Sequence, residues 1–199
     1  MKRSMLLLLV SGALLIGFGM PVLSEDSGKI DFKKVMEDYM KLHQPGEEHK
    51  QLMFAVGDYD VQGKMWMEPG KDPMPMRGTS TIRAIGATFL HEKIMLIMPG
   101  NKKMDVEGFI GYDNESKQYQ ATFVSGGCTT TRTMNGTYDA KTKTVTYQCA
   151  FKCPVTGKNY SEKMIAKHEG NGTMTLTASG TYEGMPEFKM WEATYTKLE

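Results

Sequence analysis

The sequence predicts a mostly β protein, an antiparallel up-and-down β-barrel of about ten strands that follows short N-terminal helices. Two observations support this fold. From residue 57 onward, apolar and polar residues alternate in short runs, and alternation with a period of two is typical of strands. Clusters of Gly, Pro, Asn, Asp and Lys separate these runs at short intervals, which favours direct connections between neighbouring strands.

The clearest pattern lies in residues 108–125, GFIGYDNESKQYQATFVS. Two alternating runs flank residues 113–117, where Asp and Asn side chains can bond their own backbone and so favour a turn. The segment therefore predicts a β-hairpin. Its parity predicts that Tyr119, Ala121 and Phe123 face the interior of the barrel.

Residues 1–24 have the pattern of an export signal. Lys2 and Arg3 precede an apolar run from Met5 to Met20, and a segment ending at Ser24 fits signal-peptidase cleavage. A retained membrane anchor is the alternative, but the glycines and proline in this segment favour cleavage. We expect a periplasmic or secreted protein, with no stable membrane insertion after cleavage near Ser24.

Removal of residues 1–24 takes away two cations and no anions, so 24 − 2 = 22 Lys and Arg residues remain against 23 Asp and Glu. The mature net charge is therefore −1, and this balance lacks the basic excess that nucleic-acid binding usually requires. We expect a leader over residues 25–45 and one domain over residues 46–199.

Helical spacing is confined to the leader and the start of the domain. The apolar residues Phe32, Val35, Met36, Tyr39 and Met40 fall on one helical face, and Asp31 can cap that helix. Pro45 and Gly46 end it. A second short helix is expected from Glu47 to about Ala55, packed at one end of the sheet.

Ten strands are expected after these helices. They lie near residues 59–67, 77–86, 88–98, 104–112, 118–125, 129–138, 143–151, 160–168, 173–180 and 187–197. Closure of such a meander into a barrel removes its exposed edges. An open sandwich is the alternative architecture.

Several segments together resemble one family. They are EHK at 48–50, WMEPG at 66–70, GYDN at 111–114, GTYD at 136–139, TGK at 156–158 and FKMWEATY at 188–195. This combination resembles the DUF1579 family over roughly residues 46–197, and the resemblance implies a lipocalin-like (calycin-like) barrel. The chain departs from the family pattern at Tyr59 and Phe123, where Trp is expected. The family implies no catalytic residues.

Three cysteines in an exported chain favour oxidation. If the turn over residues 139–142 places Tyr138 opposite Lys143, Cys128 faces Cys153, at a Cα separation of ~4.5–5.5 Å that suits a disulfide. The sequence therefore predicts a Cys128–Cys153 bridge and leaves Cys149 unpaired.

The methionines and histidines, residue types that can bind metals, are not spaced as in a recognisable metal site. Met65, Met67, Met74 and Met76 flank one loop and suggest Cu(I) thioether binding as a minor alternative to simple packing. The four histidines are scattered, and haem ligation by His49 or His168 is a further minor alternative. We expect no metal, no cofactor and no catalytic residues.

The leading functional hypothesis is non-catalytic binding of a small apolar molecule inside the barrel. The candidates for inward-facing ligand contacts are Tyr119, Phe123, Trp66 and Trp191. Barrels of this size can enclose one small ligand in a cavity of a few hundred cubic ångströms. The alternatives are an enzyme with a dispersed site at the barrel mouth, which needs titratable groups converging in the cavity, and a structural or interaction protein of the cell envelope.

Overall fold

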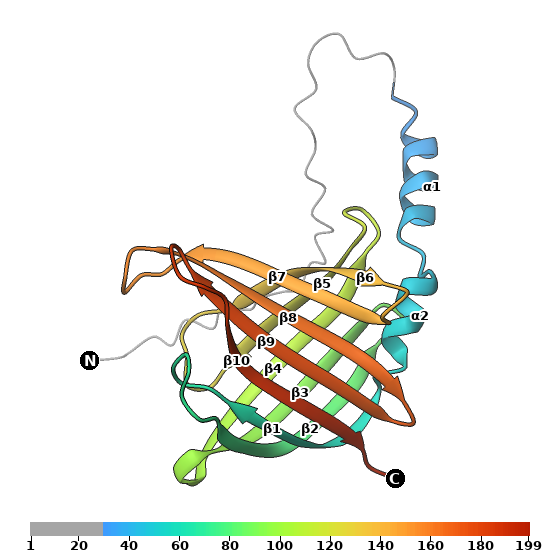
Figure 1. Ribbon diagram of the computed structural model, residues 1–199. Coiled ribbons are helices and arrows are strands. Elements are labelled where there is room, and N and C mark those ends of the chain that lie inside the picture. Colours follow the sequence, from blue (N-terminus) through green and yellow to red (C-terminus); the bar gives the residue numbers. More distant parts are fainter. Residues whose placement is uncertain (1–29) are drawn as a thin grey trace, which may run out of the picture. The chain divides into compact units, whose positions relative to one another are not determined.

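The computed structural model describes residues 30–199 of the chain (Figure 1). The expected signal peptide over residues 1–24 lies outside the described residues. The chain divides into two compact units after Met40. No helix within residues 30–199 is long and apolar enough to cross a membrane.

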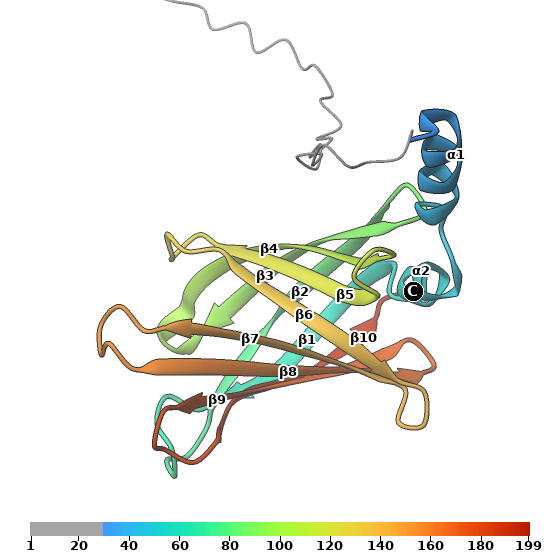
Figure 2. The same cartoon turned by 90° about the horizontal axis from the view of Figure 1, so that it is seen from above.

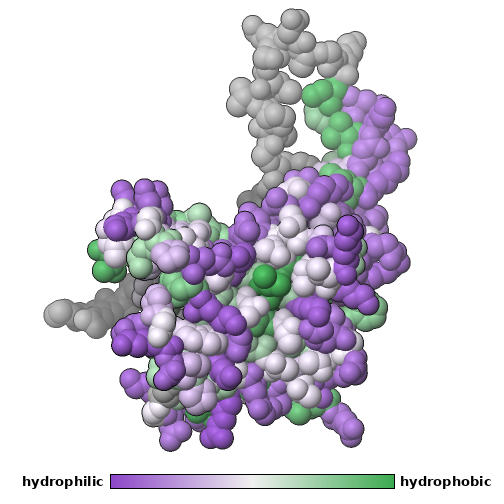
Figure 3. Space-filling view, in the orientation of Figure 1, coloured by the Kyte–Doolittle hydropathy of each residue, from purple (hydrophilic) through white to green (hydrophobic). Residues whose placement is uncertain are grey.

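Helix α1 spans Phe32–Leu42 and matches the predicted helix of the leader. The side chain of Asp31 accepts a hydrogen bond of 3.2 Å from the backbone N–H of Lys34, which satisfies one of the free donors at the helix start. Apolar residues gather along one side of this helix and polar residues along the other (Figure 3).

The second unit is a closed ten-stranded antiparallel barrel that begins with helix α2, Glu47–Met53. Its strands wrap round one interior, and β1 closes against β10 (Figures 1 and 2). The strands are β1 Gly57–Met65, β2 Met74–Ile85, β3 Phe89–Met98, β4 Lys102–Asp113, β5 Gln118–Ser125, β6 Arg132–Asp139, β7 Thr144–Lys152, β8 Asn159–Gly170, β9 Thr173–Tyr182 and β10 Phe188–Lys197. The predicted barrel is confirmed, and the open sandwich is excluded because closure leaves no free edge.

The hairpin of β4 and β5 has the predicted form. Tyr112 pairs with Tyr119 across the turn, and the carboxylate of Asp113 accepts hydrogen bonds from the backbone N–H groups of Glu115 and Ser116 at 2.9 and 3.2 Å. Tyr119 and Ala121 are buried at 3% and 0% exposure, so the predicted parity is confirmed. The hydrogen bonds of Asp113 within the turn explain why an acidic residue stands at this position.

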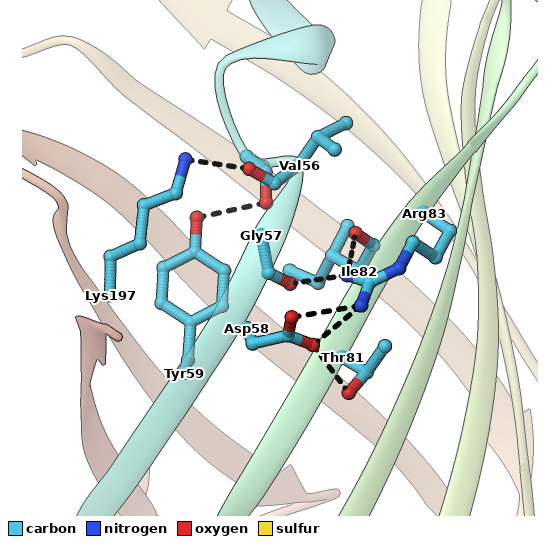
Figure 4. A network of polar contacts seen from close by, with 9 residues as sticks. Val56, Gly57, Asp58, Tyr59, Thr81, Ile82, Arg83 and Lys197 are labelled. Atoms are coloured by element: carbon cyan, nitrogen blue, oxygen red, sulfur yellow. Dashed lines mark hydrogen bonds and ion pairs between the residues drawn. The ribbon is translucent and has the colours of Figure 1, made fainter. Parts of the chain in front are cut away.

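A polar network on the outer face links the start of β1 to its two neighbouring strands (Figure 4). Arg83 donates two hydrogen bonds of 2.8 Å to the carboxylate of Asp58, one to each oxygen. These bonds lower the pKa of that carboxyl group. On the other side of β1, Lys197 Nζ donates to the carbonyl oxygen of Val56 at 2.7 Å. The two contacts link β1 to β2 and β10 at the end of the barrel that carries α2, called the α2 end below.

Helix α2 is fixed to the barrel by a buried histidine. His49 Nδ1 accepts from the backbone N–H of Gly46 at 3.0 Å, which assigns the proton to Nε2. Nε2 therefore donates to the carbonyl oxygen of Tyr112, also at 3.0 Å. The ring is 3% exposed, and both of its nitrogens have partners. His49 therefore has a structural role as an anchor of α2.

The predicted disulfide between Cys128 and Cys153 is wrong, because all three cysteines are free thiols. Asp139 pairs with Thr144, so the turn lies one residue further along the chain than the sequence predicted, and every pair across β6 and β7 shifts by two. Cys128 lies in the exposed loop before β6, beyond the region where the two strands pair.

Candidate functional site

A cavity of about 960 Å³ occupies the α2 end of the barrel. Apolar and aromatic side chains from most of the strands form its wall, and α2 and the loop over residues 141–143 contribute to its rim. Interior side chains that represent this wall are Ile82, Leu90, Ile110, Ala121, Met164 and Leu176. The apolar character of its wall follows from the sequence pattern, since every second residue of each strand points inward.

A second cavity of about 250 Å³ lies toward the opposite end. The residues that line both cavities are Glu92, Phe123, Met164, Leu176 and Tyr195, so the two spaces adjoin. Arg132 and Glu162 also line the smaller cavity, and their side chains lie 3.7 Å apart. Burial raises the pKa of the Glu162 carboxyl group, although the nearby guanidinium opposes that shift.

Glu92 of β3 lies where the two cavities meet, and its side chain is 4% exposed. Ser80 of β2 donates a hydrogen bond of 2.7 Å to its Oε1 atom. Tyr195 of β10 also bonds to its carboxyl group. Burial raises the pKa of Glu92, because a low-dielectric interior disfavours the charged form, and the two hydroxyl donors oppose this shift only in part.

Tyrosines surround this carboxyl group. Tyr59 and Tyr195 contact each other with ring centroids 6.0 Å apart, and Tyr147 is 4% exposed. Burial is the main cause that raises the pKa of all three phenols, and the charge of Glu92 raises it further. The phenols therefore stay neutral at physiological pH and offer O–H groups and ring faces to the interior.

The rim of the larger cavity is polar. Lys141, Lys143 and His168 are exposed there, and Lys167 forms a 2.6 Å ion pair with Glu169. Just inside, the hydroxyl of Tyr119 donates to Gln51 Oε1 at 3.0 Å, which joins β5 to α2. The interior is thus mostly apolar, with a basic rim at the α2 end.

The four sequence candidates are placed differently. Tyr119 and Phe123 line the larger cavity, and Trp191 lines the smaller one. Trp66 lies just beyond β1, half-buried, with Lys189 Nζ 5.2 Å from its ring centroid, and it lines neither cavity. Its strand has ended at Met65, so the alternation that predicted its direction no longer applies.

Sequence reasoning missed Glu92. One signal for it exists, since this residue shares the inward parity of Leu90 and Ile94 in an otherwise apolar strand face. A charged residue at an inward position is uncommon unless it has partners. Its partner Ser80 lies on the neighbouring strand β2, but Tyr195 comes from β10 at the far end of the sequence, so alternation alone does not identify the cluster.

The residues considered for metal or haem binding are not gathered into one site. Met65 and Met76 line the smaller cavity, whereas Met67 is 67% exposed. His168 is exposed at the rim of the larger cavity, and its Nδ1 accepts from the backbone N–H of Gly170 at 3.2 Å. Within residues 30–199, no group of three His, Cys, Asp or Glu side chains is arranged to hold a metal ion.

Comparisons with known proteins agree with this fold. The family described as "Protein of unknown function (DUF1579)" matches residues 44–197. The crystal structure of Rv2717c from M. tuberculosis aligns with a TM-score of 0.59 at 12% sequence identity, over 78% of this chain and 100% of that chain. At this identity the likeness concerns the fold alone. A comparison with curated proteins found no match.

Proposed function

Because the chain belongs to the DUF1579 family, whose description assigns no function, we propose from its own geometry that the barrel binds a small, mostly apolar molecule in its interior without transforming it. The observation that carries this proposal is the cavity of about 960 Å³ inside the closed barrel. Cavities that hold small molecules typically measure about 300–1,000 Å³ and have apolar walls with a few polar groups.

The apolar wall of the cavity supports an apolar ligand. The wall of the cavity is formed by residues such as Leu90, Ile110 and Leu176, which leave little polar surface to hold water. Transfer of apolar surface from water into such a space contributes about 25 cal/mol per Å². A ligand that fills the space would therefore gain most of its affinity from burial, and the few polar groups would determine its orientation.

Export of the protein is the second part of the proposal. Lys2, Arg3 and the apolar run from Met5 to Met20 support a cleaved signal peptide, with Glu25 as the first residue of the mature chain. An exported barrel would meet its ligand in the periplasm or outside the cell. The mass of the purified product tests this directly, because cleavage after Ser24 removes 24 residues.

Catalysis is the second candidate function, and one observation favours it. Glu92, Ser80 and Tyr195 converge in the interior, and a buried carboxyl group with a raised pKa suits general acid–base chemistry. The hydroxyl groups of Ser80 and Tyr195 both donate hydrogen bonds to the carboxyl group of Glu92. A structural or recognition role is enough to explain this arrangement, and we therefore prefer binding.

The test is to express the full chain, incubate the purified protein in extract of its host, and identify retained small molecules by native mass spectrometry. Ala166 lines the larger cavity, so the Ala166→Trp variant should lose the retained molecule. Ala150 is exposed on the outside of β7, and Ala150→Trp should keep it. Retention by both variants, or by neither, would contradict binding in the cavity. Release of a chemically changed molecule would favour catalysis.

A further inference from the structure

Glu92 is a buried carboxyl group whose hydrogen-bond partners carry no charge. The groups that bond to it, Ser80 and Tyr195, are neutral hydroxyls. Within residues 30–199, no Lys, Arg or His side chain forms an ion pair with it. Buried charges in proteins are normally paired, because an uncompensated charge in a low-dielectric interior is strongly unfavourable.

Glu92 also occupies the position from which a ligand would be recognised. It lines both cavities, so a molecule in either space reaches its carboxyl group. The side chains that share this junction are mainly apolar or aromatic, namely Phe123, Met164, Leu176 and Tyr195. An apolar ligand in the larger cavity would therefore meet Glu92 at a mainly apolar junction, whereas Glu162 in the smaller cavity is already paired with Arg132.

We propose that the interior site is selective for apolar molecules that carry a basic amine, with the ammonium group of the ligand bound to the carboxylate of Glu92. This inference rests on the proposed function. An ammonium group would supply the missing counter-charge and donate charge-assisted hydrogen bonds, which are roughly twice as strong as neutral ones. The ring of Tyr195, which lines both cavities, would add cation–π attraction.

The rim of the cavity provides the competing arrangement. Lys141 and Lys143 are exposed there and would attract an anionic head group, leaving only an apolar tail in the interior. The two arrangements differ in the charge of the head group and in its distance from Glu92. A comparison of ligands with the same tail and different head groups therefore separates them.

The experiment uses decylamine, decanol and decanoate, titrated by calorimetry into the protein purified after expression of the full chain. The wild type should bind decylamine roughly tenfold or more tightly than decanol, as expected for one charge-assisted contact. Glu92→Gln keeps the shape of the side chain and removes its charge, and it should bring the two affinities to within about twofold. Glu68 lies in the exposed loop after β1, so Glu68→Gln should leave the preference unchanged.

The outcomes separate this inference from the function on which it rests. If decanol binds but decylamine binds no more tightly, or if Glu92→Gln leaves the amine preference intact, the assignment of Glu92 is overturned while interior binding stands. Tightest binding of decanoate would also overturn it and assign the head group to the lysines of the rim. If none of the three probes binds, the proposed function fails together with this inference.

Discussion

Ser80 donates a 2.7 Å hydrogen bond to Glu92, and both side chains are buried in the interior of the barrel. The two residues are diagonal neighbours, because Ser80 pairs with Ile94 and Glu92 pairs with Ile82 in the ladder of β2 and β3. Tyr195 reaches the same carboxyl group from β10. Side chains from three strands thus meet at one acidic group, where a wholly apolar packing would be expected.

Ser80→Ala should destabilise the protein by about 1–3 kcal/mol, because it removes a donor from a buried carboxyl group. Thr79→Ala is the matched control, since Thr79 is the next residue of β2 and is exposed on the outer face. Urea denaturation of both variants measures the difference in unfolding free energy. Equal effects of the two substitutions would show that the buried hydrogen bond contributes nothing specific.

Stability should depend on pH through Glu92 in a defined direction. Its pKa is raised by burial, so the folded state holds the proton to higher pH than the unfolded state, whose glutamates titrate near pH ~4.3. The contribution of Glu92 to stability is therefore fully present below that value and is lost as the pH rises through the folded-state pKa. The slope for one proton is at most about 1.4 kcal/mol per pH unit.

Denaturation across this pH range, for wild type and for Glu92→Gln, isolates that contribution. The difference in unfolding free energy should shift in favour of the Gln variant as the pH rises, because Gln has no proton to lose. Glu68→Gln, in the exposed loop after β1, is the control and should follow the wild type. A constant difference between Glu92→Gln and wild type would mean that Glu92 titrates alike in the folded and unfolded states.

His49→Ala should cost about 2–3 kcal/mol, because the backbone N–H of Gly46 and the carbonyl oxygen of Tyr112 lose their partner and a space remains beneath α2. Its effect should be local, with faster hydrogen exchange in residues 46–55 while the strands stay protected. Lys50→Ala, at the next and exposed position of α2, should leave that exchange nearly unchanged. Unaltered exchange in His49→Ala would contradict the anchoring role of this histidine.

The three thiols should differ in reactivity towards an alkylating reagent in the folded protein. Cys128 is exposed, and hydrogen bonds from the Thr130 side chain and backbone lower its pKa, so it should react first. Cys149 should react last, because burial raises its pKa. Hydrogen bonds from the Thr156 side chain, and from the backbone of Thr156 and Val155, lower the pKa of Cys153 to about 7. Its side chain is only 9% exposed, however, so Cys153 should react after Cys128 and before Cys149.

Mass spectrometry after alkylation in denaturant, without reductant, provides the reference for the thiol experiment. All three cysteines should then carry the label. A chain that takes up only one label under these conditions would contain a disulfide and would contradict the free thiols of the structure.

The sequence predicted those features that depend on residues close together in the chain. Alternation located the ten strands, and the turn chemistry of Asp113 set the register in which Tyr112 pairs with Tyr119. The predicted turn between β6 and β7 lies one residue earlier than the observed one. Asp139 and Thr144 can flank a four-residue loop as well as Tyr138 and Lys143 can, so the sequence does not distinguish the two registers. The alternation of β6 and β7 is the same in both registers.

The candidate site was predicted only in part for a related reason. Inward parity identified Tyr119 and Phe123, since it is a property of one strand. The cluster at Glu92 depends instead on which strands become neighbours when the barrel closes. Ser80 precedes Glu92 by one hairpin, whereas Tyr195 reaches it only because β10 closes against β1.

The most direct test of interior binding is a methyl NMR titration of methionine-labelled protein with decanol. Met164 lines both cavities and Met174 lines the larger one, whereas Met67 and Met185 are exposed on the outside at 67% and 49%. If the barrel binds an apolar molecule in its interior, the methyl signals of Met164 and Met174 shift and saturate, and those of Met67 and Met185 do not. Shifts confined to Met67 and Met185, or no saturable shift, would contradict the account.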